Sequence, residues 1–560
     1  MSKDLRIGVF VCHCGINIGG YVDVPDVVEY SENLNDVVYA EPNLYTCSSD
    51  GLQKIQEAIK KHDLNRVVVA SCTPRTHEPL FQSACEEAGL NKYLFEMANI
   101  RDQCSWVHMH EPEKATEKAK DLVRMAVAKA RLLTPEEEPE IEIQPVGLII
   151  GGGVSGMTAA LSLEDQGFNV HLVEKTDKLG GILNDLDSLF PSNMKANDVI
   201  NPLIDRIADS KNINVYLKSE IENIKGFIGN FDVDIRGRGQ SIPINVGTII
   251  LATGAEYLEP VGLYGYDEIG QVVTQKELED KIRKKQLDDV KKIVMIQCVS
   301  ARNEERPYCS RICCSEAMKN AKLLADEDPD RDIYILYRDL QTYGLEYTEM
   351  EWNAKQSGVK LLKYEKDRLP VVENCLNGQK VSLFSPLLGT ELTIESDMVV
   401  LSVPLIPNPD NKKLSQLLKV PINSDGFFME AHVKLRPVDF ATDGVYVCGT
   451  AHSPKEVAES ISQAKGAASR AGIPMAKRTL KTAAYSSVVD ETKCSGCGTC
   501  IEVCPYNAIS KNEKGLAEVT AAVCKGCGVC GASCPEKAIT MRHFTNEEID
   551  AQGLAALKEA

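Results

Sequence analysis

Two cysteine runs near the end of the chain have a spacing that binds iron. Residues 494–505 read CSGCGTCIEVCP and residues 524–535 read CKGCGVCGASCP, so each run is C-x2-C-x2-C-x3-C-P. In this pattern three thiolates hold one [4Fe–4S] cluster and the fourth reaches a second cluster. A four-cysteine zinc site is the alternative, and two complete runs in tandem disfavour it. We therefore predict two clusters, one held by Cys494, Cys497, Cys500 and Cys534, the other by Cys524, Cys527, Cys530 and Cys504.

A glycine-rich turn has the residues and spacing of a dinucleotide site. An apolar strand runs into Gly151-x-Gly153-x-x-Gly156, a helix follows, and a second strand ends at Glu174. The glycines let the backbone approach a pyrophosphate at the helix N-terminus, and an acidic residue at this distance binds ribose hydroxyls. The predicted contacts to the dinucleotide are Gly151, Gly153, Val154, Ser155, Gly156, Glu174 and Lys175.

Three later segments favour FAD as the dinucleotide. KLGG (178–181) closely follows the second strand, and TIILATGA (248–255) is a strand that ends in a turn back to the cofactor. TDGVYVCGTAHSP (442–454) resembles the late strand and turn that meet the ribityl chain, although a threonine replaces the usual acid there. These segments add Gly180, Gly181, Ala252, Thr253, Gly254, Gly449 and Thr450 to the predicted FAD site.

A second group of cysteines stands where such flavoproteins normally bind NAD(P)H. The strand KKIVMIQC (291–298) is in the expected place, but CVSARNEERPYCSRICC continues it without the glycines that cradle a phosphate. We predict a [4Fe–4S] cluster held by four cysteines; a redox-active dithiol or simple burial is the alternative. A flavin beside clusters can exchange electrons in pairs on one side and singly on the other. The predicted ligands are Cys298, Cys309, Cys313 and Cys314.

The first 110 residues place five further cysteines near the ends of four predicted strands. The runs RIGVFV, DVVYA, NRVVVAS and KYLFEMA alternate with helical spacing, which predicts a small α/β domain with a mostly parallel sheet. Ligands bind at the carboxyl edge of such a sheet. Packed, non-ligating cysteines are the alternative to a cluster. We expect one [4Fe–4S] cluster held by Cys14, Cys47, Cys72 and Cys104, with Cys12 as the fifth competitor that we leave out.

The composition of the chain indicates which binding partners and which cellular compartment to expect. The chain has 560 residues and a formal net charge of −19, which argues against non-specific binding to nucleic acid because a phosphate backbone needs a basic face. No apolar run approaches the roughly 20 residues of a membrane span, and MSKDLRIGVF does not resemble a signal peptide. We expect a cytoplasmic protein whose 20 cysteines bind metal instead of pairing as disulfides.

These patterns together predict an α/β chain of five segments. The flavin segment has the order of a thioredoxin-reductase-like two-dinucleotide domain, and the cysteine runs predict an α+β ferredoxin of the bacterial type. The expected segments are the N-terminal α/β domain (1–110), a helix and linker (111–145), the FAD domain with a cluster in place of the NAD site (146–480), the two-cluster ferredoxin domain (481–541) and a C-terminal helix (542–560).

The constellation resembles the A-subunit family of heterodisulfide reductases. The motifs that carry the resemblance span most of the chain: VCHCGINIGG (11–20), CTPRTHEPLF (72–81), LFEMANIRDQCSWVH (94–108), QCVSARNEERPYCSRICC (297–314), YRDLQTYGLEY (337–347) and FTNEEIDAQGLAAL (544–557). The resemblance implies a bifurcating or confurcating FAD with charged groups nearby, for which Glu346 and Lys455 are the candidates. It also implies partner subunits of a heterodisulfide-reductase-like complex, an electron-donating dehydrogenase or hydrogenase, ferredoxin, and a homodimer within the assembly.

One departure from longer family members leaves the mechanism open. Those members carry a ferredoxin-like insert after the LGG segment, whereas ILNDLDSLFPSNMKANDVINPLI continues here without a cysteine. One electron exit is therefore absent or supplied by another protein. The alternatives to bifurcation are a flavin and iron–sulfur relay that serves another reductase, or a scaffold whose clusters are mainly structural.

Overall fold

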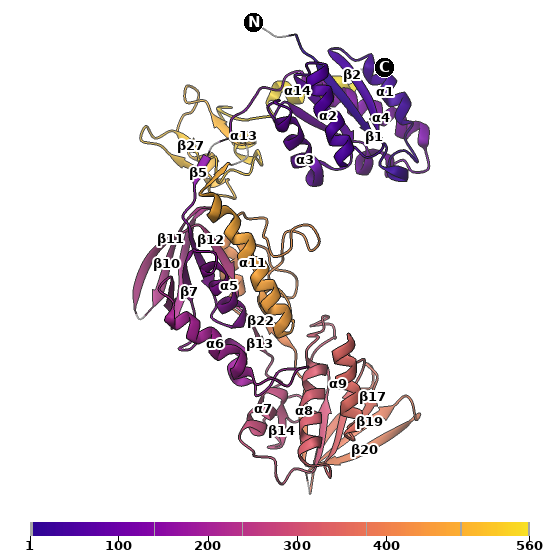
Figure 1. The fold of residues 1–560 in the computed structure, drawn as a ribbon, viewed down its shortest axis with the longest axis vertical. Helices are drawn as coiled ribbons and strands as arrows, with labels where there is room; N and C mark the ends of the chain where they lie inside the picture. The colour runs from indigo at the N-terminus through magenta and orange to yellow at the C-terminus, as the bar shows by residue number, and fades with distance from the viewer. Residues whose placement is uncertain (1–3, 139, 238, 377, 482–483, 558–560) are drawn as a thin grey trace. The chain divides into compact units, whose positions relative to one another are not determined.

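The computed structural model (Figure 1) divides the chain into two units. The first unit contains residues 1–140 and 481–560, and the second contains residues 141–480. Strands β5 (Glu140–Glu142) and β24 (Thr479–Lys481) lie on the two connections between the units. The residues that the structure describes are 4–138, 140–237, 239–376, 378–481 and 484–557.

A four-stranded parallel sheet forms the N-terminal domain of the first unit, in the order β2–β1–β3–β4. Strand β1 is buried along its whole length, as expected for a central strand of a parallel sheet with both faces covered. Because all four strands run the same way, the loops that follow them meet at one edge. The elements are β1 (Ile7–Cys12), α1 (Val24–Glu32), β2 (Val37–Asn43), α2 (Ser49–Lys61), β3 (Arg66–Ser71), α3 (Pro74–Glu87), β4 (Phe95–Asn99) and α4 (Pro112–Ala130).

The ferredoxin domain of the first unit is built from two short antiparallel pairs, β25 with β28 and β26 with β27. A short helix follows each cysteine loop. The last helix packs against α4, where the Arg124 guanidinium donates a 2.8 Å hydrogen bond to the Ala555 carbonyl. The elements are β25 (Ser487–Val489), α12 (Thr499–Glu502), β26 (Ile509–Lys511), β27 (Ala517–Val519), α13 (Val529–Ser533), β28 (Ile539–Met541) and α14 (Asn546–Leu557).

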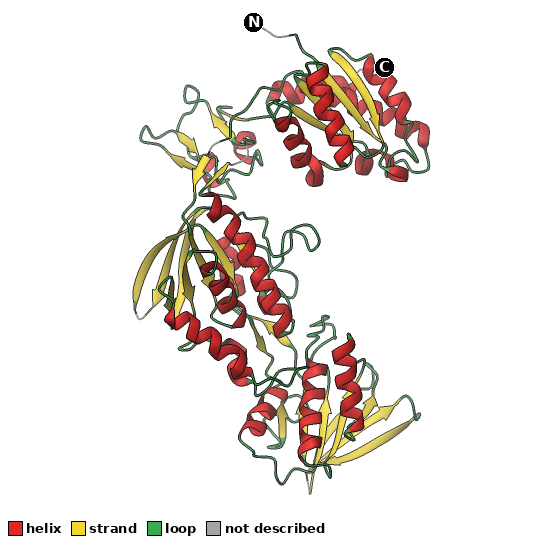
Figure 2. Cartoon of the chain, viewed as in Figure 1, coloured by secondary structure: helices red, strands yellow, loops and turns green. Residues whose placement is uncertain are grey.

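The second unit repeats one arrangement twice: a five-stranded parallel sheet followed by a three-stranded antiparallel sheet (Figure 2). The first copy has the parallel order β23–β12–β6–β7–β8, with β9, β10 and β11 as the antiparallel sheet. Its elements are β6 (Val146–Ile150), α5 (Val154–Glu164), β7 (Asn169–Val173), α6 (Ala196–Asp209), β8 (Ile213–Tyr216), β9 (Ser219–Phe227), β10 (Asn230–Gly237), β11 (Gln240–Val246), β12 (Thr248–Leu251), β23 (Val445–Val447) and α11 (Val457–Lys477).

The second copy has the parallel order β14–β21–β15–β16–β17 and the antiparallel sheet β18–β19–β20. Two short strands, β13 (Ala255–Tyr257) and β22 (Leu405–Pro407), pair where the chain passes between the copies. The remaining elements are β14 (Val272–Thr274), α7 (Gln275–Arg283), β15 (Lys292–Ile296), α8 (Cys313–Glu327), β16 (Asp332–Tyr337), α9 (Leu345–Gln356), β17 (Lys360–Lys363), β18 (Val371–Cys375), β19 (Gly378–Ser385), β20 (Thr390–Ser396), β21 (Met398–Leu401) and α10 (Asn411–Leu418).

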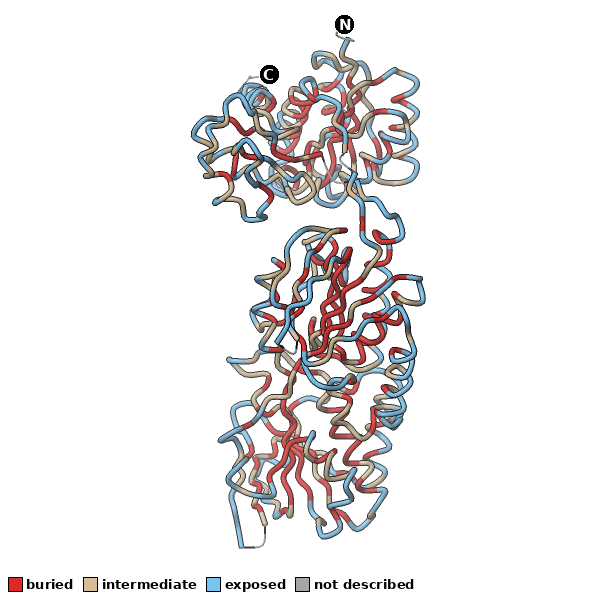
Figure 3. The backbone as a smooth tube through the Cα atoms, turned by 90° about the vertical axis from the view of Figure 1, so that its left-hand side faces the viewer, coloured by how far each residue is buried: buried red, intermediate tan, exposed pale blue. Residues whose placement is uncertain are grey.

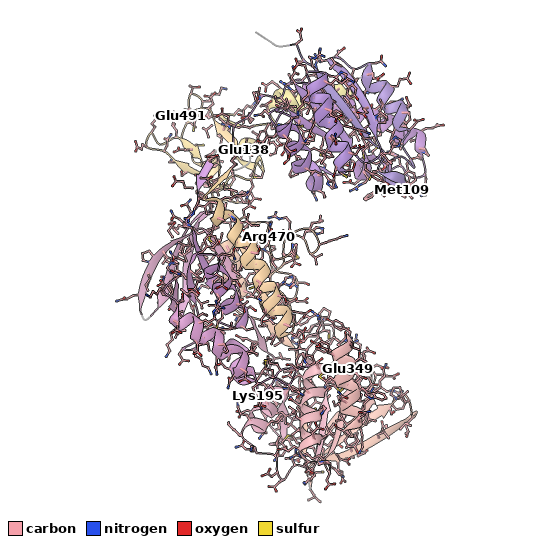
Figure 4. All side chains as sticks on the ribbon, viewed as in Figure 1. Met109, Glu138, Lys195, Glu349, Arg470 and Glu491 are labelled. Atoms are coloured by element: carbon pink, nitrogen blue, oxygen red, sulfur yellow. The ribbon has the colours of Figure 1, made fainter. Side chains whose placement is uncertain are left out.

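Buried apolar strands and small-residue helix faces hold this unit together. Figure 3 shows the buried segments following the parallel strands of both copies. Helices α5 and α11 pack closely because α11 presents a row of fully buried alanines to the core, which lets two backbones approach. Arg470, labelled on α11 in Figure 4, forms a bidentate ion pair with buried Asp439 at 2.7 and 3.1 Å. The alanine row is Ala464, Ala467, Ala468 and Ala471.

Candidate flavin and iron–sulfur sites

A cavity of about 710 Å³ opens at the carboxyl ends of β6 and β7, a volume typical of small-molecule sites. It brings together all of the predicted FAD residues except Gly156 and Gly449. The predicted residues that line it are Gly151, Gly153, Val154, Ser155, Glu174, Lys175, Gly180, Gly181, Ala252, Thr253, Gly254 and Thr450.

The turn between β6 and α5 fits the close approach that a pyrophosphate requires. A β-carbon on Gly156 would lie 1.8 Å from the Gly151 carbonyl oxygen, so this residue packs the helix against the turn instead of facing the cavity. Helix α5 begins at Val154 and directs its free N–H groups and positive dipole end toward the cavity. The buried Glu174 carboxylate accepts a 2.7 Å hydrogen bond from the Gly152 amide, which fixes it beside the turn. The residues present therefore fit FAD, and Glu174 stays the predicted acceptor for the ribose hydroxyls.

The segment before α11 adds a buried cation to the cavity. The Lys455 ammonium donates hydrogen bonds of 2.8 Å to the carbonyls of Gly449 and Ser453. Burial lowers the pKa of Lys455 to about 8, so the side chain stays mainly charged at neutral pH. A β-carbon on Gly449 would lie 2.2 Å from the Ser155 hydroxyl, so Gly449 supports the cavity wall from behind. Of the two charged groups predicted near the flavin, Lys455 is the one that lines the cavity.

The other predicted charged group lies outside the cavity lining. Glu346 is exposed on the first turn of α9 and is not among the residues that line the cavity. Its charge acts on Glu456, which does line the cavity, so a role for Glu346 at the flavin stays a prediction.

A buried ion pair at the same cavity was missed by the sequence analysis. The Lys319 ammonium of α8 pairs with the Glu279 carboxylate of α7, and both side chains are fully buried. Lys319 also donates a 2.8 Å hydrogen bond to the Ser188 carbonyl, and Glu279 accepts a 2.9 Å bond from the Asp187 amide. Burial, followed by the charge of Glu279, raises the pKa of neighbouring Glu316 to about 7. The cavity wall thus carries a second fixed cation with its counter-ion.

Helical spacing from the cysteines was the available signal for this pair. Residues Ile312, Glu316 and Lys319 recur at intervals of four and three residues from the start of α8, and all three line the cavity. Lys319 is a charged residue on the apolar face of a helix that begins at two cysteines, and this position could have identified it as a candidate cavity residue.

The four cysteines after β15 lie together at the start of α8. Burial raises the pKa of the Cys313 thiol well above its usual value, and the charges of Glu316 and of the other three cysteines raise it further. Burial also raises the pKa of Cys314 to about 12. Buried, mutually repelling thiols stay protonated unless a metal takes the protons' place. The Cys309 sulfur accepts a 3.3 Å hydrogen bond from the Arg311 amide, an arrangement suited to a ligating thiolate. The four predicted ligands are therefore brought together in a form that fits a cluster.

The N-terminal sheet edge gathers a different set of four cysteines from the predicted one. Burial raises the pKa of Cys72 to about 11, and the charges of Cys47, Cys14 and Cys12 add to that increase. The Cys12 sulfur, at the end of β1, accepts a 3.4 Å hydrogen bond from the Thr46 amide in the next loop. Cys12 is thus beside the other three thiols.

Cys104 is not part of this group. Its side chain is fully buried in the domain core, and its Sγ donates a 3.0 Å hydrogen bond to the Ala115 carbonyl of α4. The backbone turn over Arg101–Ser105 after β4 directs the thiol toward α4. Among the described residues, its pKa responds to burial and to Lys118 and not to another cysteine. The structure therefore brings Cys12, and not the predicted Cys104, beside Cys14, Cys47 and Cys72.

The ferredoxin cysteines have the predicted arrangement around their first site. A small cavity is bordered by Cys494, Cys497, Cys500 and Cys534, the set predicted for one cluster.

The second half of the ferredoxin domain repeats the first. The Ala508 amide donates a 3.3 Å hydrogen bond to Cys504 Sγ, and the Ala538 amide donates one of the same length to Cys534 Sγ. Near the predicted second site, the Ser487 hydroxyl lies 3.1 Å from Cys530 Sγ and 3.8 Å from Cys524 Sγ. In the described part of the chain, no three His, Cys, Asp or Glu side chains are placed to hold a single metal ion.

Two known protein families match the segments of the chain that contain the ferredoxin and flavin sites. A family model described as a 4Fe-4S dicluster domain matches residues 487–541, and one described as pyridine nucleotide-disulphide oxidoreductase matches residues 147–296. The second match ends just before Cys298. The A subunit of the H(2):CoB-CoM heterodisulfide,ferredoxin reductase of Methanothermobacter thermautotrophicus is 40% identical, and the alignment covers 100% of this chain and 98% of the relative. The chain belongs to the A-subunit family of heterodisulfide reductases.

A second relative agrees with this membership. A protein of Archaeoglobus profundus, named as similar to the A subunit of heterodisulfide reductase, is 35% identical over 91% of each chain. Among solved structures, the thioredoxin reductase of T. acidophilum is 17% identical, covers 60% of this chain and 99% of its own, and has a TM-score of 0.42. The family and the two matching models make this chain an oxidoreductase subunit with a flavoprotein domain and a two-cluster [4Fe–4S] domain.

The alignment with the Methanothermobacter relative also bears on length. It runs over 649 positions although this chain has 560 residues, so the relative carries residues that this family member lacks. Among the residues that the structure describes, no helix is both long enough and apolar enough to cross a membrane.

Proposed function

We propose that this family member passes electrons between a two-electron flavin and one-electron iron–sulfur clusters. FAD, held by the β6–α5 turn and Glu174, would accept or release electrons as pairs. The clusters would carry them singly. Four clusters are proposed: two in the ferredoxin domain, one at the start of α8 and one at the N-terminal sheet edge, the last held by Cys12, Cys14, Cys47 and Cys72.

One observation supports the conversion from pairs to single electrons. Helix α8 begins with the ligand candidates Cys313 and Cys314, and its neighbours Ile312, Glu316 and Lys319 line the flavin cavity. A single helix end thus belongs to both sites. A cluster held there would be the first acceptor for an electron that leaves the flavin.

The cavity residues support a specific division of tasks. The Lys319–Glu279 pair and Lys455 supply two fixed cations in a buried wall, where a charge acts more strongly than in water. These cations would stabilise the electron-rich flavin. Glu174 and the N-terminus of α5 would hold the nucleotide half of the cofactor.

The finer proposal is that the flavin bifurcates or confurcates electrons within a complex. Two relatives of this chain are named as A subunits of reductases whose names include H(2) or H(2)/formate, CoB-CoM heterodisulfide and ferredoxin. We propose corresponding partners: heterodisulfide-reductase-like subunits, an electron-donating dehydrogenase or hydrogenase, and ferredoxin, with two copies of this chain in a cytoplasmic assembly. The −19 charge supports protein partners over nucleic acid.

A non-bifurcating relay is the second candidate, and one observation favours it. The segment after Gly181 forms a short turn at Gly181–Asp185 and then α6, with no cysteine and no inserted domain. An exit for one of two separated electrons is therefore missing from this chain.

Photoreduction of the flavin in the anaerobically purified protein tests the proposal. Light and a sacrificial donor reduce the flavin, and electron paramagnetic resonance then follows the clusters. We expect cluster signals in the wild type. The Cys313→Ser/Cys314→Ser variant should lose about four iron atoms and slow cluster reduction at least about tenfold. Cys375→Ser, an exposed cysteine on β18, is the matched control and should behave as the wild type.

Two outcomes would contradict the proposal. Unchanged cluster reduction in the double variant would remove the α8 site from the electron path. Absence of flavin from the wild-type protein would refute the function as a whole. A flavin radical that accumulates at equilibrium would select the relay over bifurcation.

A further inference from the structure

A half-buried acid–imidazole pair stands behind Lys455 and has no part in the sites described above. The His452 Nε2 atom pairs with the Glu430 carboxylate, and the exposed fractions of the two side chains are only 21% and 9%. On the other side of the ring, His452 Nδ1 lies 3.4 Å from Lys455 Nζ and 3.3 Å from Gln463 Nε2. The three residues Glu430, His452 and Lys455 therefore form a line that ends at the flavin cavity.

The hydrogen-bond partners determine the tautomer of the imidazole. A carboxylate only accepts, so Nε2 must carry the hydrogen that His452 donates to Glu430. An ammonium only donates, so Nδ1 of His452 must be the bare nitrogen that accepts from Lys455. Gln463 agrees, because its oxygen accepts a 2.9 Å hydrogen bond from the Gly449 amide and its NH₂ group is left to face Nδ1.

The ring is neutral in this arrangement. Burial and then the charge of Lys455 lower the pKa of His452, and the charge of Glu430 only partly opposes this. A neutral ring with a bare Nδ1 attracts the ammonium, whereas a charged ring would repel it. Glu430 therefore acts on Lys455 through His452.

The other charged groups around Lys455 do not take this role. Glu459 favours the charged form of Lys455, but its carboxylate is paired with the Arg311 guanidinium at 2.8 Å. Arg311 opposes the charge on Lys455, and the thiol of Cys448 favours it. Glu459 is the largest charged contribution in favour of the Lys455 ammonium, and Glu430 is a smaller one. Glu430 differs in that it reaches Lys455 through a side-chain contact, the His452 imidazole.

We propose that Glu430 and His452 are positioning residues that hold the Lys455 ammonium at the wall of the flavin cavity. The ammonium opposes negative charge on the flavin ring, and the pair fixes both its place and its protonation. This inference rests on the proposed function, since it assigns a role toward bound FAD.

Sulfite titration of the oxidised holoprotein tests the proposal without measuring turnover. Sulfite donates an electron pair to a flavin ring nitrogen and forms a sulfur–nitrogen bond, so the adduct is anionic and a nearby cation strengthens it. His452→Phe keeps a ring but removes both nitrogens, and should weaken sulfite binding about tenfold, the scale of a lost hydrogen bond to a charged group. His452→Gln retains an amide oxygen for Lys455 and should recover part of the affinity.

Further variants separate positioning from general damage. Glu430→Gln should weaken sulfite binding in the same direction, and Glu391→Gln, an exposed carboxylate on β20, should not change it. Lys455→Met should weaken binding at least as much as His452→Phe. Combining the two should add little, because both changes act on one interaction.

The outcomes distinguish this inference from the proposed function. Equal sulfite affinity in the wild type, His452→Phe and Glu430→Gln, with flavin content and thermal unfolding unchanged, would overturn the positioning role alone. If His452→Phe or Glu430→Gln fails to fold, the sulfite affinity of His452→Gln is compared with that of the wild type at two pH values. The wild type should lose sulfite affinity as Lys455 deprotonates, and His452→Gln should lose it at lower pH. Identical pH profiles would also overturn the inference. A wild-type protein that binds no FAD would instead refute the proposed function.

Discussion

Replacing single cysteines at the N-terminal sheet edge separates ligands from packed thiols. With four [4Fe–4S] clusters, the wild-type chain should contain about sixteen iron atoms. Cys12→Ala should remove about four of them, because Cys12 lies with the other three thiols and the cubane needs four ligands. Cys104→Ala should keep all the iron. It should lower the free energy of unfolding by about 1–2 kcal/mol, because a buried sulfur and its hydrogen bond to the Ala115 carbonyl are lost.

Iron and protein quantitation on anaerobically purified samples, together with denaturant unfolding, measures both effects. Cys85→Ala is the matched control, since Cys85 is a fully buried core cysteine in α3 that neighbours none of the sites. It should resemble Cys104→Ala in both measurements. The reasoning is refuted if Cys104→Ala loses iron and Cys12→Ala does not.

Three further predictions follow from the second unit. Glu174→Ala should weaken FAD binding about 10- to 100-fold, the scale of hydrogen bonds to a charged group, and equilibrium dialysis would contradict this by showing equal affinity. Lys319→Met should lower the free energy of unfolding by about 3–5 kcal/mol, because the Glu279 carboxylate is left buried and unpaired. The double variant Lys319→Met/Glu279→Leu should recover much of this lost stability. A Lys319→Met variant as stable as the wild type would contradict the importance of the ion pair. The pKa of Lys455 is lowered to about 8 in the folded protein, against 10.5 in the unfolded chain, so the unfolded state binds more protons between these two pH values. The free energy of unfolding of the wild type, relative to that of Lys455→Met, should therefore rise from pH 8 to 10.5. A difference between the two proteins that stays constant with pH in denaturant unfolding would contradict this prediction.

Local motifs made the ferredoxin and flavin sites predictable from the sequence. In the C-terminal runs, ligand spacing within one loop sets the cluster geometry, so Cys494, Cys497 and Cys500 needed no tertiary information. The glycine turn after β6 is equally local: its strand, turn and helix are contiguous, and Glu174 lies at the end of the next strand.

The N-terminal ligand set could be predicted only in part. Strand order places a cysteine at the sheet edge, but the direction of its side chain depends on the backbone after the strand. Cys12 is the last residue of β1, whereas Cys104 lies in a turn that rotates it toward α4. No pattern in a single sequence distinguishes these two cases.

Charged residues in the cavity were the least predictable part. Lys319 and Glu279 belong to different helices and pair only after α7 and α8 pack, so no local spacing joins them. The role of Glu346 stays a prediction, because the side chain is exposed on the first turn of α9 and outside the cavity lining. Lys455, predicted as a charged group near the flavin, lines the cavity, but its link to His452 and Glu430 requires the folded turn after β23.

Light-driven reduction of the protein's own flavin, followed by electron paramagnetic resonance of the clusters, tests the central claim most directly. The claim is that flavin and clusters form one electron path through the start of α8. The account predicts that cluster signals follow flavin reduction in the wild type and in Cys375→Ser, and that Cys313→Ser/Cys314→Ser delays them at least about tenfold while leaving FAD bound. Cluster reduction at the wild-type rate in the double variant would contradict the account.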